Sequence, residues 1–354
     1  MKGFNLDPAR ILDELGEFNR KLIDSCDTLA DIDEIDVGQT PADLVYREDK
    51  VQLLRYRSQT ATACHTPVLI CYALVNRPYV IDLEPERSLV RELLSLGLDL
   101  YLIDWGYPDA ADRFLDLDDY INGYLDNCVD QVRRHSGRDR INLLGICQGG
   151  TFSLCYTALN PQKIRSLITL VTPVDFKTAD NRLSHLAQQV DTDLAVDTYG
   201  NIPGQVLNEC YRSLMPMRLG IQKHLAMSEQ LGSREQALSF LRMEKWIHDS
   251  PDQAGEAFRQ FIRDCFQQNR LLHNEMIIGE RPVDLRAIDQ PLLNIYGRYD
   301  HLVPPSASIP LEALTSSRDY EALCVPAGHI GVFVSRRART LVAPRIASWL
   351  IEHD

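Results

Sequence analysis

The chain has 354 residues, of which 45% are hydrophobic and 25% are charged, and its formal net charge at pH 7 is −13. This acidic balance argues against a nucleic-acid binder, because phosphate contacts need a positive surface and the run Arg336-Arg337-Ala338-Arg339 is too short to supply one. No apolar run approaches the roughly 20 residues of a membrane span. The nine cysteines show neither a C-x-x-C pair nor a zinc-like spacing, and this pattern is typical of free thiols in a reducing cytosol.

The first predicted element is an amphipathic helix between Phe4 and Leu29, where apolar residues recur at near-helical spacing. The acidic stretch 31–36 follows it. We predict that residues 1–45 form an N-terminal helical arm and an acidic linker. The arm either packs on its own domain or docks a partner, and both interpretations stay open here.

Beyond the arm, short apolar runs that predict buried strands alternate with helical patterns. Strands alternating with helices predict a mostly parallel sheet that is covered on both faces and binds its ligands at the carboxyl ends of the strands. The predicted strands are 51–56, 68–74, 98–103, 141–145, 167–171, 292–296 and 320–325, and the helices between and after them are 85–96, 117–135, 149–159 and 341–351.

The segment Gly145-Ile146-Cys147-Gln148-Gly149 joins a predicted buried strand to a predicted helix. It has the strand–turn–helix context of the nucleophile elbow G-x-S-x-G, with cysteine in place of serine. Flanking glycines let the strand and the helix pass closely beneath a nucleophile that is raised on a strained turn. Taken alone, the segment fits a catalytic nucleophile and a buried structural cysteine equally well.

Two later loops favour the catalytic interpretation. Asp300 follows the predicted strand 292–296, and His329 follows the strand 320–325. The chain order of nucleophile, acid and base is that of the triad in α/β-hydrolases. The sequence therefore predicts an α/β-hydrolase fold with a triad of Cys147, Asp300 and His329.

One long gap interrupts the alternation of strands and helices. Helical patterns fill it at 205–214, 234–246 and 251–268. We predict that residues 176–286 form a largely helical cap insertion, and that 46–175 and 287–354 form the catalytic core. A cap over Cys147 would exclude water and shape an acyl pocket.

Several motifs near these positions point to one family. Together they resemble the catalytic subunit of polyhydroxyalkanoate synthases, in the short two-subunit form called class III, and the likeness runs from about Val51 to the C-terminus. The motifs are Gly145-Ile146-Cys147-Gln148-Gly149-Gly150, Tyr299-Asp300-His301-Leu302-Val303-Pro304, Gly328-His329-Ile330-Gly331, the segment 76–83 and the segment 103–106.

The resemblance implies roles for individual residues. Cys147 would carry the acyl group as a thioester, and His329 would deprotonate it and the 3-hydroxyl of the incoming unit. Asp300 would orient His329, or would itself act as the base for the hydroxyl. His301, beside Asp300, would either contact the active site or serve packing. The oxyanion hole would use the backbone N–H of Gln148 and one from Val75 or Asn76.

The function that this resemblance implies is polymerisation of (R)-3-hydroxyacyl-CoA, in the first place 3-hydroxybutyryl-CoA, with release of CoA. No metal or organic cofactor is expected, and the chain has neither phosphate-loop nor dinucleotide-binding motif. The expected partners are a companion synthase subunit, in a homodimer or hetero-oligomer, and the surface of polyester granules in the cytoplasm. The alternatives are a cysteine-dependent hydrolase, similar to dienelactone hydrolases or thioesterases, and a non-catalytic granule-binding protein.

Overall fold

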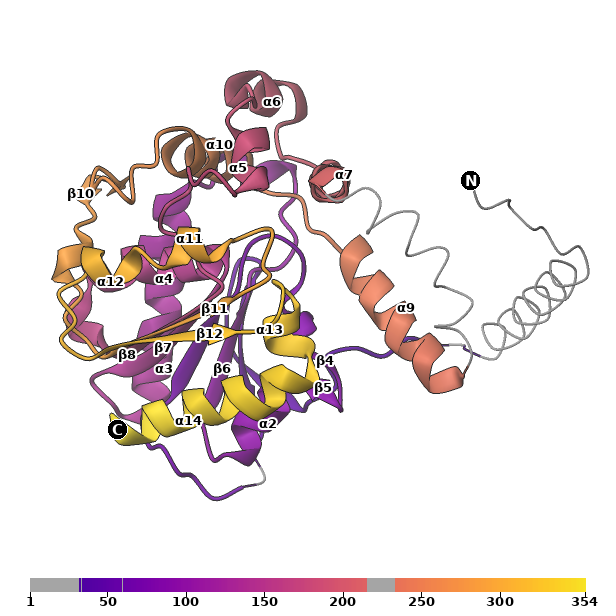
Figure 1. The fold of residues 1–354 in the computed structure, drawn as a ribbon, viewed down its shortest axis with the longest axis vertical. Helices are drawn as coiled ribbons and strands as arrows, with labels where there is room; N and C mark the ends of the chain where they lie inside the picture. The colour runs from indigo at the N-terminus through magenta and orange to yellow at the C-terminus, as the bar shows by residue number, and fades with distance from the viewer. Residues whose placement is uncertain (1–31, 33, 59, 215–232) are drawn as a thin grey trace, which may run out of the picture.

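The computed structural model describes residues 32, 34–58, 60–214 and 233–354, and the helix predicted between Phe4 and Leu29 lies outside this part. An eight-stranded sheet with the order β1-β2-β6-β3-β7-β8-β11-β12 forms its centre (Figure 1). β1 and β2 run antiparallel to each other and β2 runs antiparallel to β6, whereas the pairs from β6 to β12 are parallel. The strands are β1 (Ala42–Glu48), β2 (Val51–Tyr56), β3 (Val68–Cys71), β6 (Leu100–Asp104), β7 (Ile141–Ile146), β8 (Ile164–Leu170), β11 (Leu292–Gly297) and β12 (Tyr320–Val325).

The central strands are apolar along their length because both faces of the sheet are covered. Side chains alternate between the faces, so Leu69 and Leu143 join one hydrophobic cluster while Ile70 and Leu144 join the other. Helices α3 and α4 pack into the first cluster, and helices α2 and α14 pack into the second (Figure 1). Their bounds are α2 (Leu89–Ser95), α3 (Asp126–Ser136), α4 (Gln148–Leu159) and α14 (Ala343–Glu352).

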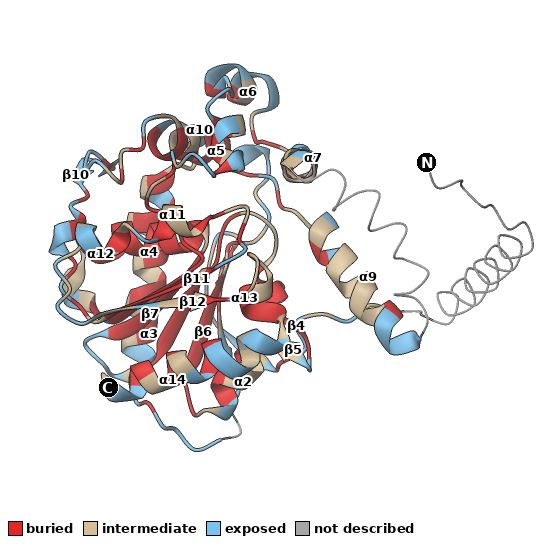
Figure 2. Cartoon of the chain, in the orientation of Figure 1, coloured by how far each residue is buried: buried red, intermediate tan, exposed pale blue. Residues whose placement is uncertain are grey.

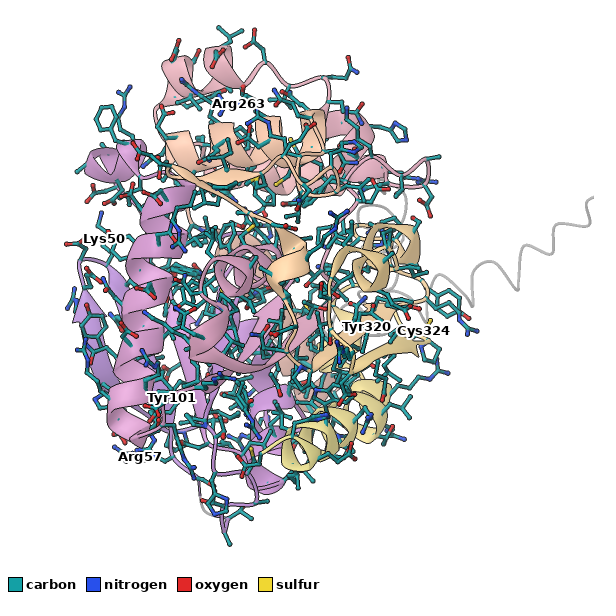
Figure 3. The ribbon with its side chains drawn as sticks, turned by 90° about the vertical axis from the view of Figure 1, so that its left-hand side faces the viewer. Lys50, Arg57, Tyr101, Arg263, Tyr320 and Cys324 are labelled. Atoms are coloured by element: carbon teal, nitrogen blue, oxygen red, sulfur yellow. The ribbon has the colours of Figure 1, made fainter. Side chains whose placement is uncertain are left out.

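The two ends of the sheet lie on opposite sides of the molecule. Figure 3 shows Lys50 and Arg57, which flank β2, on one side, and Tyr320 and Cys324 of β12 on the other. Sequence reasoning did not predict β1. None of its residues is buried, and it carries charged residues, so it lacks the continuous apolar run of the central strands.

Helices make up most of the described part of the connection between β8 and β11, with α5, α6 and α10 at the top of Figure 1 and α9 at its right. Figure 2 shows α6 largely exposed, whereas the central strands are buried. The boundaries of a cap domain at 176 and 286 remain a prediction. These helices are α5 (Arg182–Ala187), α6 (Thr192–Tyr199), α7 (Gly204–Leu214), α9 (Arg234–His248), α10 (Gly255–Phe261) and the continuing turn η6 (Ile262–Gln267).

A polar cluster attaches α9 to the core. Glu84, whose side chain is almost fully buried, pairs with Arg242 of α9 at 3.1 Å and accepts a hydrogen bond from Ser239 of the same helix at 2.9 Å. Arg242 also donates to the backbone oxygen of Asp36 at 2.8 Å. The helix is therefore held both by the short ribbon of β4 (Asp82–Glu84) and β5 (Arg87–Ser88) and by the segment before β1.

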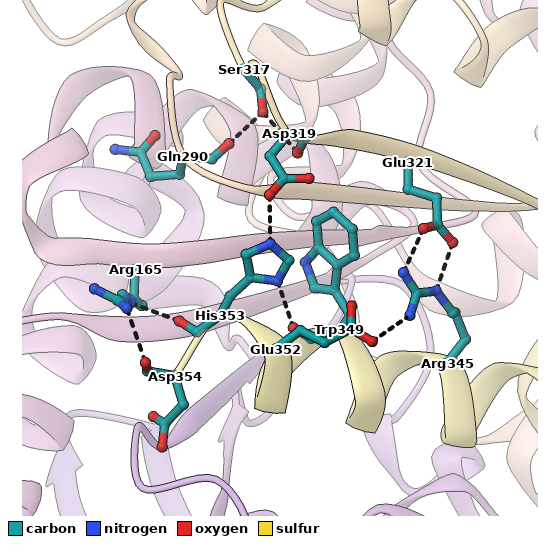
Figure 4. Close-up of polar contacts among 10 residues, drawn as sticks. All are labelled: Arg165, Gln290, Ser317, Asp319, Glu321, Arg345, Trp349, Glu352, His353 and Asp354. Atoms are coloured by element: carbon teal, nitrogen blue, oxygen red, sulfur yellow. Dashed lines mark hydrogen bonds and ion pairs between the residues drawn. The ribbon is translucent and has the colours of Figure 1, made fainter.

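A second polar cluster fixes the end of α14, as Figure 4 shows. His353 lies between the carboxylate of Asp319 and the backbone oxygen of Trp349, at 2.6 Å from each. Arg345 pairs with Glu321 of β12. These contacts join the last helix to the amino end of β12, away from the carboxyl ends of the strands. The remaining short elements are η1 (Pro78–Ile81), η2 (Ala110–Phe114), η3 (Asp119–Leu125), η4 (Pro161–Lys163), β9 (Ile277–Ile278), β10 (Arg281–Pro282), η7 (Leu285–Ala287), α11 (Pro305–Ser308), α12 (Leu311–Leu314), α13 (Gly331–Val334) and η8 (Ala338–Val342).

Candidate active site

Cys147 occupies the single residue between β7 and α4. Its backbone has φ 55° and ψ −122°, a conformation that non-glycine residues rarely adopt. The N–H of Cys147 donates to the backbone oxygen of Leu170 in β8 at 2.9 Å, which holds the turn against the neighbouring strand. Strain of this kind persists only where the surroundings fix it, and it gathers at functional sites.

The glycines after Cys147 are required by close packing. A Cβ atom on Gly149 would overlap the backbone oxygen of Cys71, and one on Gly150 would overlap the side chain of Thr172. The first turn of α4 therefore passes directly over β3 and the loop after β8. The positions that the sequence pattern singled out leave no room for any side chain.

The loop after β11 carries Asp300, and the loop after β12 carries His329. Nδ1 of His329 lies 2.6 Å from Oδ2 of Asp300. The other carboxylate oxygen of Asp300 accepts the backbone N–H groups of Leu302 and Val303, each at 2.9 Å. With its side chain fully buried and both oxygens engaged, Asp300 holds the ring of His329 in one orientation.

Two opposing effects act on the pKa of His329. Burial lowers it, but the Asp300 carboxylate and the Cys147 thiol raise it, and the net result is a pKa well above the usual value. Since Nδ1 is engaged by Asp300 and the His329 side chain also has a hydrogen bond with Cys147, Nε2 is the ring nitrogen that can exchange a proton with Cys147. The arrangement can therefore form an imidazolium next to a thiolate.

Cys147 and His329 share a cavity of about 1080 Å³. Side chains from α5, α7, α9, α10 and η6 form much of its wall, and most of them are apolar. His301 also lines the cavity, next to the loop of Asp300. The helices between β8 and β11 therefore line one part of a large, mostly apolar space at the carboxyl ends of the strands.

The loop after β3 carries the residues predicted as the second oxyanion donors. The N–H of Leu74 donates to the side-chain oxygen of Gln148 at 3.0 Å, so this loop is attached to the residue that follows the nucleophile. Val75 and Asn76 come next and line the cavity. Asn76 has a φ of 58°, the left-handed conformation that asparagine adopts more readily than most residues.

The other described cysteines lie in two kinds of environment. Cys64, Cys71 and Cys155 are buried, whereas Cys210 and Cys324 are partly exposed. In the part of the chain that the structure describes, no group of 3 or more His, Cys, Asp or Glu side chains is placed to hold a metal ion, and no helix there is long and apolar enough to cross a membrane.

Two family models match the chain. The model described as "alpha/beta hydrolase fold" matches residues 66–335, and the model "Poly-beta-hydroxybutyrate polymerase (PhaC) N-terminus" matches residues 16–93. The predicted α/β-hydrolase fold is therefore confirmed. The second match includes the N-terminal arm, whose structure lies outside the described residues.

Curated relatives match the chain over nearly its whole length. The chain is 53% identical over 350 residues to "Poly(3-hydroxyalkanoate) polymerase subunit PhaC" of Allochromatium vinosum, with 98% of this chain and 99% of the relative covered. Proteins with the same name from Thiocystis violacea and a Synechocystis strain are each 49% identical, covering 100% and 97% of this chain and 100% and 93% of the relatives.

Solved structures show the same architecture at low identity. A monoacylglycerol lipase of Paleococcus ferrophilus matches with a TM-score of 0.51 and 15% identity, covering 85% of this chain and 99% of that one. A lipase-esterase related protein of Clostridium acetobutylicum matches with a TM-score of 0.51 and 14% identity, again covering 85% and 99%. At such identities the likeness concerns the fold alone.

Proposed function

The chain belongs to the poly(3-hydroxyalkanoate) polymerase family, and we propose that it polymerises (R)-3-hydroxyacyl groups from their CoA thioesters through a covalent thioester on Cys147. One observation carries the mechanistic part. A cysteine on a strained strand-to-helix turn shares an apolar cavity with a histidine that a buried aspartate orients. Acyl transfer through a covalent intermediate needs a nucleophile such as Cys147 and a neighbouring base such as His329.

In the loading step, Nε2 of His329 takes the proton of the Cys147 thiol. The thiolate attacks the thioester carbonyl carbon, the bond between that carbon and the sulfur of CoA breaks, and CoA leaves as a thiol with the proton from His329. The backbone N–H groups of Gln148 and of Val75 or Asn76 stabilise the oxyanion that forms on the carbonyl oxygen. One thioester replaces another, so the acyl group stays activated.

In the elongation step, the 3-hydroxyl group of one acyl unit attacks the thioester carbonyl of another. The hydroxyl proton passes to His329, an ester bond forms, and the bond to the sulfur of Cys147 breaks. The proton then returns to Cys147. Asp300 stabilises the imidazolium in both steps, through its 2.6 Å contact with Nδ1.

The wall of the cavity supports a polyester product. Its apolar side chains favour an acyl chain over water beside Cys147, so a hydroxyl end of the polyester can compete as the nucleophile. We further propose 3-hydroxybutyryl-CoA as the preferred substrate. We also propose that the chain works with a companion subunit, because the relatives are named as polymerase subunits. The insoluble product places the proposed activity at the surface of polyester granules in the cytoplasm.

The test uses 3-hydroxybutyryl-CoA and follows both CoA release and insoluble polyester. Cys147→Ala should abolish both, and Cys147→Ser should be nearly inactive because a serine hydroxyl is far harder to deprotonate than a thiol. Cys155→Ala, in the helix α4 that follows Cys147, is the matched control, since that thiol is buried outside the cavity lining. Turnover above a few per cent in Cys147→Ala would refute the nucleophile, and CoA release without polyester in the wild type would instead indicate a hydrolase.

A further inference from the structure

A chain of hydrogen bonds connects the loop after β3 to the end of α9. The side-chain nitrogen of Asn76 donates to Oγ of Ser250 at 2.6 Å and to the backbone oxygen of Trp246 at 3.4 Å. The indole N–H of Trp246 donates in return to the backbone oxygen of Arg77 at 2.8 Å. Two consecutive residues of the loop are thus bound to the same end of one helix, about 170 residues away in sequence.

The same chain continues into α7. Oγ of Ser250 donates to the side-chain oxygen of Asn208 at 3.0 Å, and the amide group of Asn208 donates to the backbone oxygen of Ile247 at 2.8 Å. Asp249, between these residues, accepts the hydroxyl groups of Tyr79 and Tyr107. Ser250 therefore connects the loop after β3 to α7 at the end of α9. We call this contact region the α7–α9 junction.

On its other side the loop is attached to the nucleophile elbow and to β6. The N–H of Leu74 is held by the side chain of Gln148, and Arg77 pairs with Asp104 at 2.6 Å. Asn76 lies between these attachments with its left-handed φ of 58°. An asparagine supplies both features that this position uses, a tolerated left-handed backbone and a side-chain donor that reaches Ser250.

We propose that Asn76 and Ser250 are positioning residues that aim the backbone N–H groups of the loop at the oxyanion, so that the oxyanion hole is complete only while the α7–α9 junction is in place. This inference rests on the proposed function, because it concerns the loading of Cys147. Neither side chain reacts. Their effect passes through the backbone of Val75 and Asn76.

The expected size of the effect follows from the cost of a lost or displaced donor. Removal of one oxyanion donor costs about 10²- to 10³-fold in kcat, and a displacement of about 1 Å costs on the order of 10²-fold. Ser250→Ala leaves the backbone N–H groups of Val75 and Asn76 in the chain but no longer fixes their direction. We therefore expect kcat to fall about 10- to 100-fold while KM stays within about twofold.

The experiment compares Ser250→Ala with three matched variants in the full chain. Ser250→Thr keeps the hydroxyl and should restore most of the turnover. Asn76→Gly keeps the left-handed backbone but removes the donor, so it should match Ser250→Ala. Ser239→Ala makes the same chemical change on α9 at the contact with Glu84, and it should leave kcat unchanged.

A second readout separates oxyanion stabilisation from damage to the triad. Alkylation of Cys147 by iodoacetamide, followed by mass spectrometry of its peptide, needs the thiolate but forms no oxyanion. We expect its rate in Ser250→Ala to equal that of the wild type while loading from the CoA thioester slows. Equal losses in both reactions, or an unchanged kcat in Ser250→Ala, would overturn the inference. If alkylation of Cys147 left the wild type active, the proposed function itself would fail.

Discussion

Replacing Asp300 by asparagine tests how the triad works. The change removes the carboxylate charge and turns one of its two oxygens into an NH₂ group, with almost no change in volume. Oδ1 of Asp300 accepts the N–H groups of Leu302 and Val303, whereas Oδ2 faces Nδ1 of His329. The orientation of the new amide therefore decides the outcome.

The amide oxygen must stay on the two backbone N–H groups. The opposite orientation would leave both of them unpaired, at a cost of about 1–3 kcal/mol each. The NH₂ group then faces Nδ1 of His329, which has to become an acceptor, so the ring proton moves to Nε2. A ring protonated there cannot take the proton of Cys147. The same tautomer error in a serine-protease triad costs about 10⁴-fold in kcat, and we expect a loss of about 10³- to 10⁴-fold here.

The assay measures CoA release from 3-hydroxybutyryl-CoA, and the melting temperature of the variant shows whether it is folded. Asp319→Asn is the matched control. That residue forms an aspartate–histidine contact of the same 2.6 Å length with His353 at the amino end of β12 (Figure 4), and the change should leave turnover unaltered. If Asp300→Asn kept more than a tenth of the wild-type turnover, the tautomer argument would be refuted.

Gly150→Ala should destabilise the fold by about 3 kcal/mol, because the new Cβ overlaps the buried Thr172 and overpacking at such sites is costly. Thermal unfolding measures this loss, and Gly123→Ala is the near-neutral control. An unchanged melting temperature of Gly150→Ala would contradict the packing argument. The pKa of His329 is higher in the folded protein than in the unfolded chain, where it is about 6.5, so protonation of His329 stabilises the fold. This stabilisation is complete when the pH is below about 6.5, and it is lost as the pH rises through the pKa of the folded protein. The difference in free energy of unfolding between wild type and His329→Gln should therefore be larger at pH 6 than at pH 10, as urea titrations would show, and a difference that grew with pH would reverse the sign of this reasoning.

The sequence predicted the central strands well because burial on both faces leaves a continuous apolar run. The predicted segments 141–145 and 292–296 fall within β7 and β11, which are buried along almost their whole length and each extend one residue further. The start of α2 was placed too early, at 85, because periodicity does not see the ribbon of β4 and β5 that occupies 82–88. Ser88 begins the helix by accepting the N–H of Arg91, and this capping signal was available in the sequence.

The motif residues of the candidate site were predicted because their chemistry depends on local spacing. Cys147, Asp300 and His329 each lie in the turn or loop that follows a recognisable strand. The contacts of Asn76 were missed because they depend on partners such as Ser250, which are distant in sequence and unremarkable by residue type. Trp246 is a core residue with an exposed fraction of 6%, and its indole N–H also donates to the backbone oxygen of Arg77. Periodicity predicts which residues are buried, and it does not predict which polar groups meet.

The pairing of β8 with β11 also determines the order in which the site is assembled on the ribosome. β3, β7 and β8, with Cys147 among them, emerge before the helical connection, whereas β11 and β12 follow it and bring Asp300 and His329. Pairing across such a long connection has to wait for loop closure, so it is slow. The nascent chain thus carries Cys147 without Asp300 and His329 for the whole time that the helices are being translated. On the proposed mechanism, acyl transfer therefore has to wait until β11 and β12 have joined the sheet.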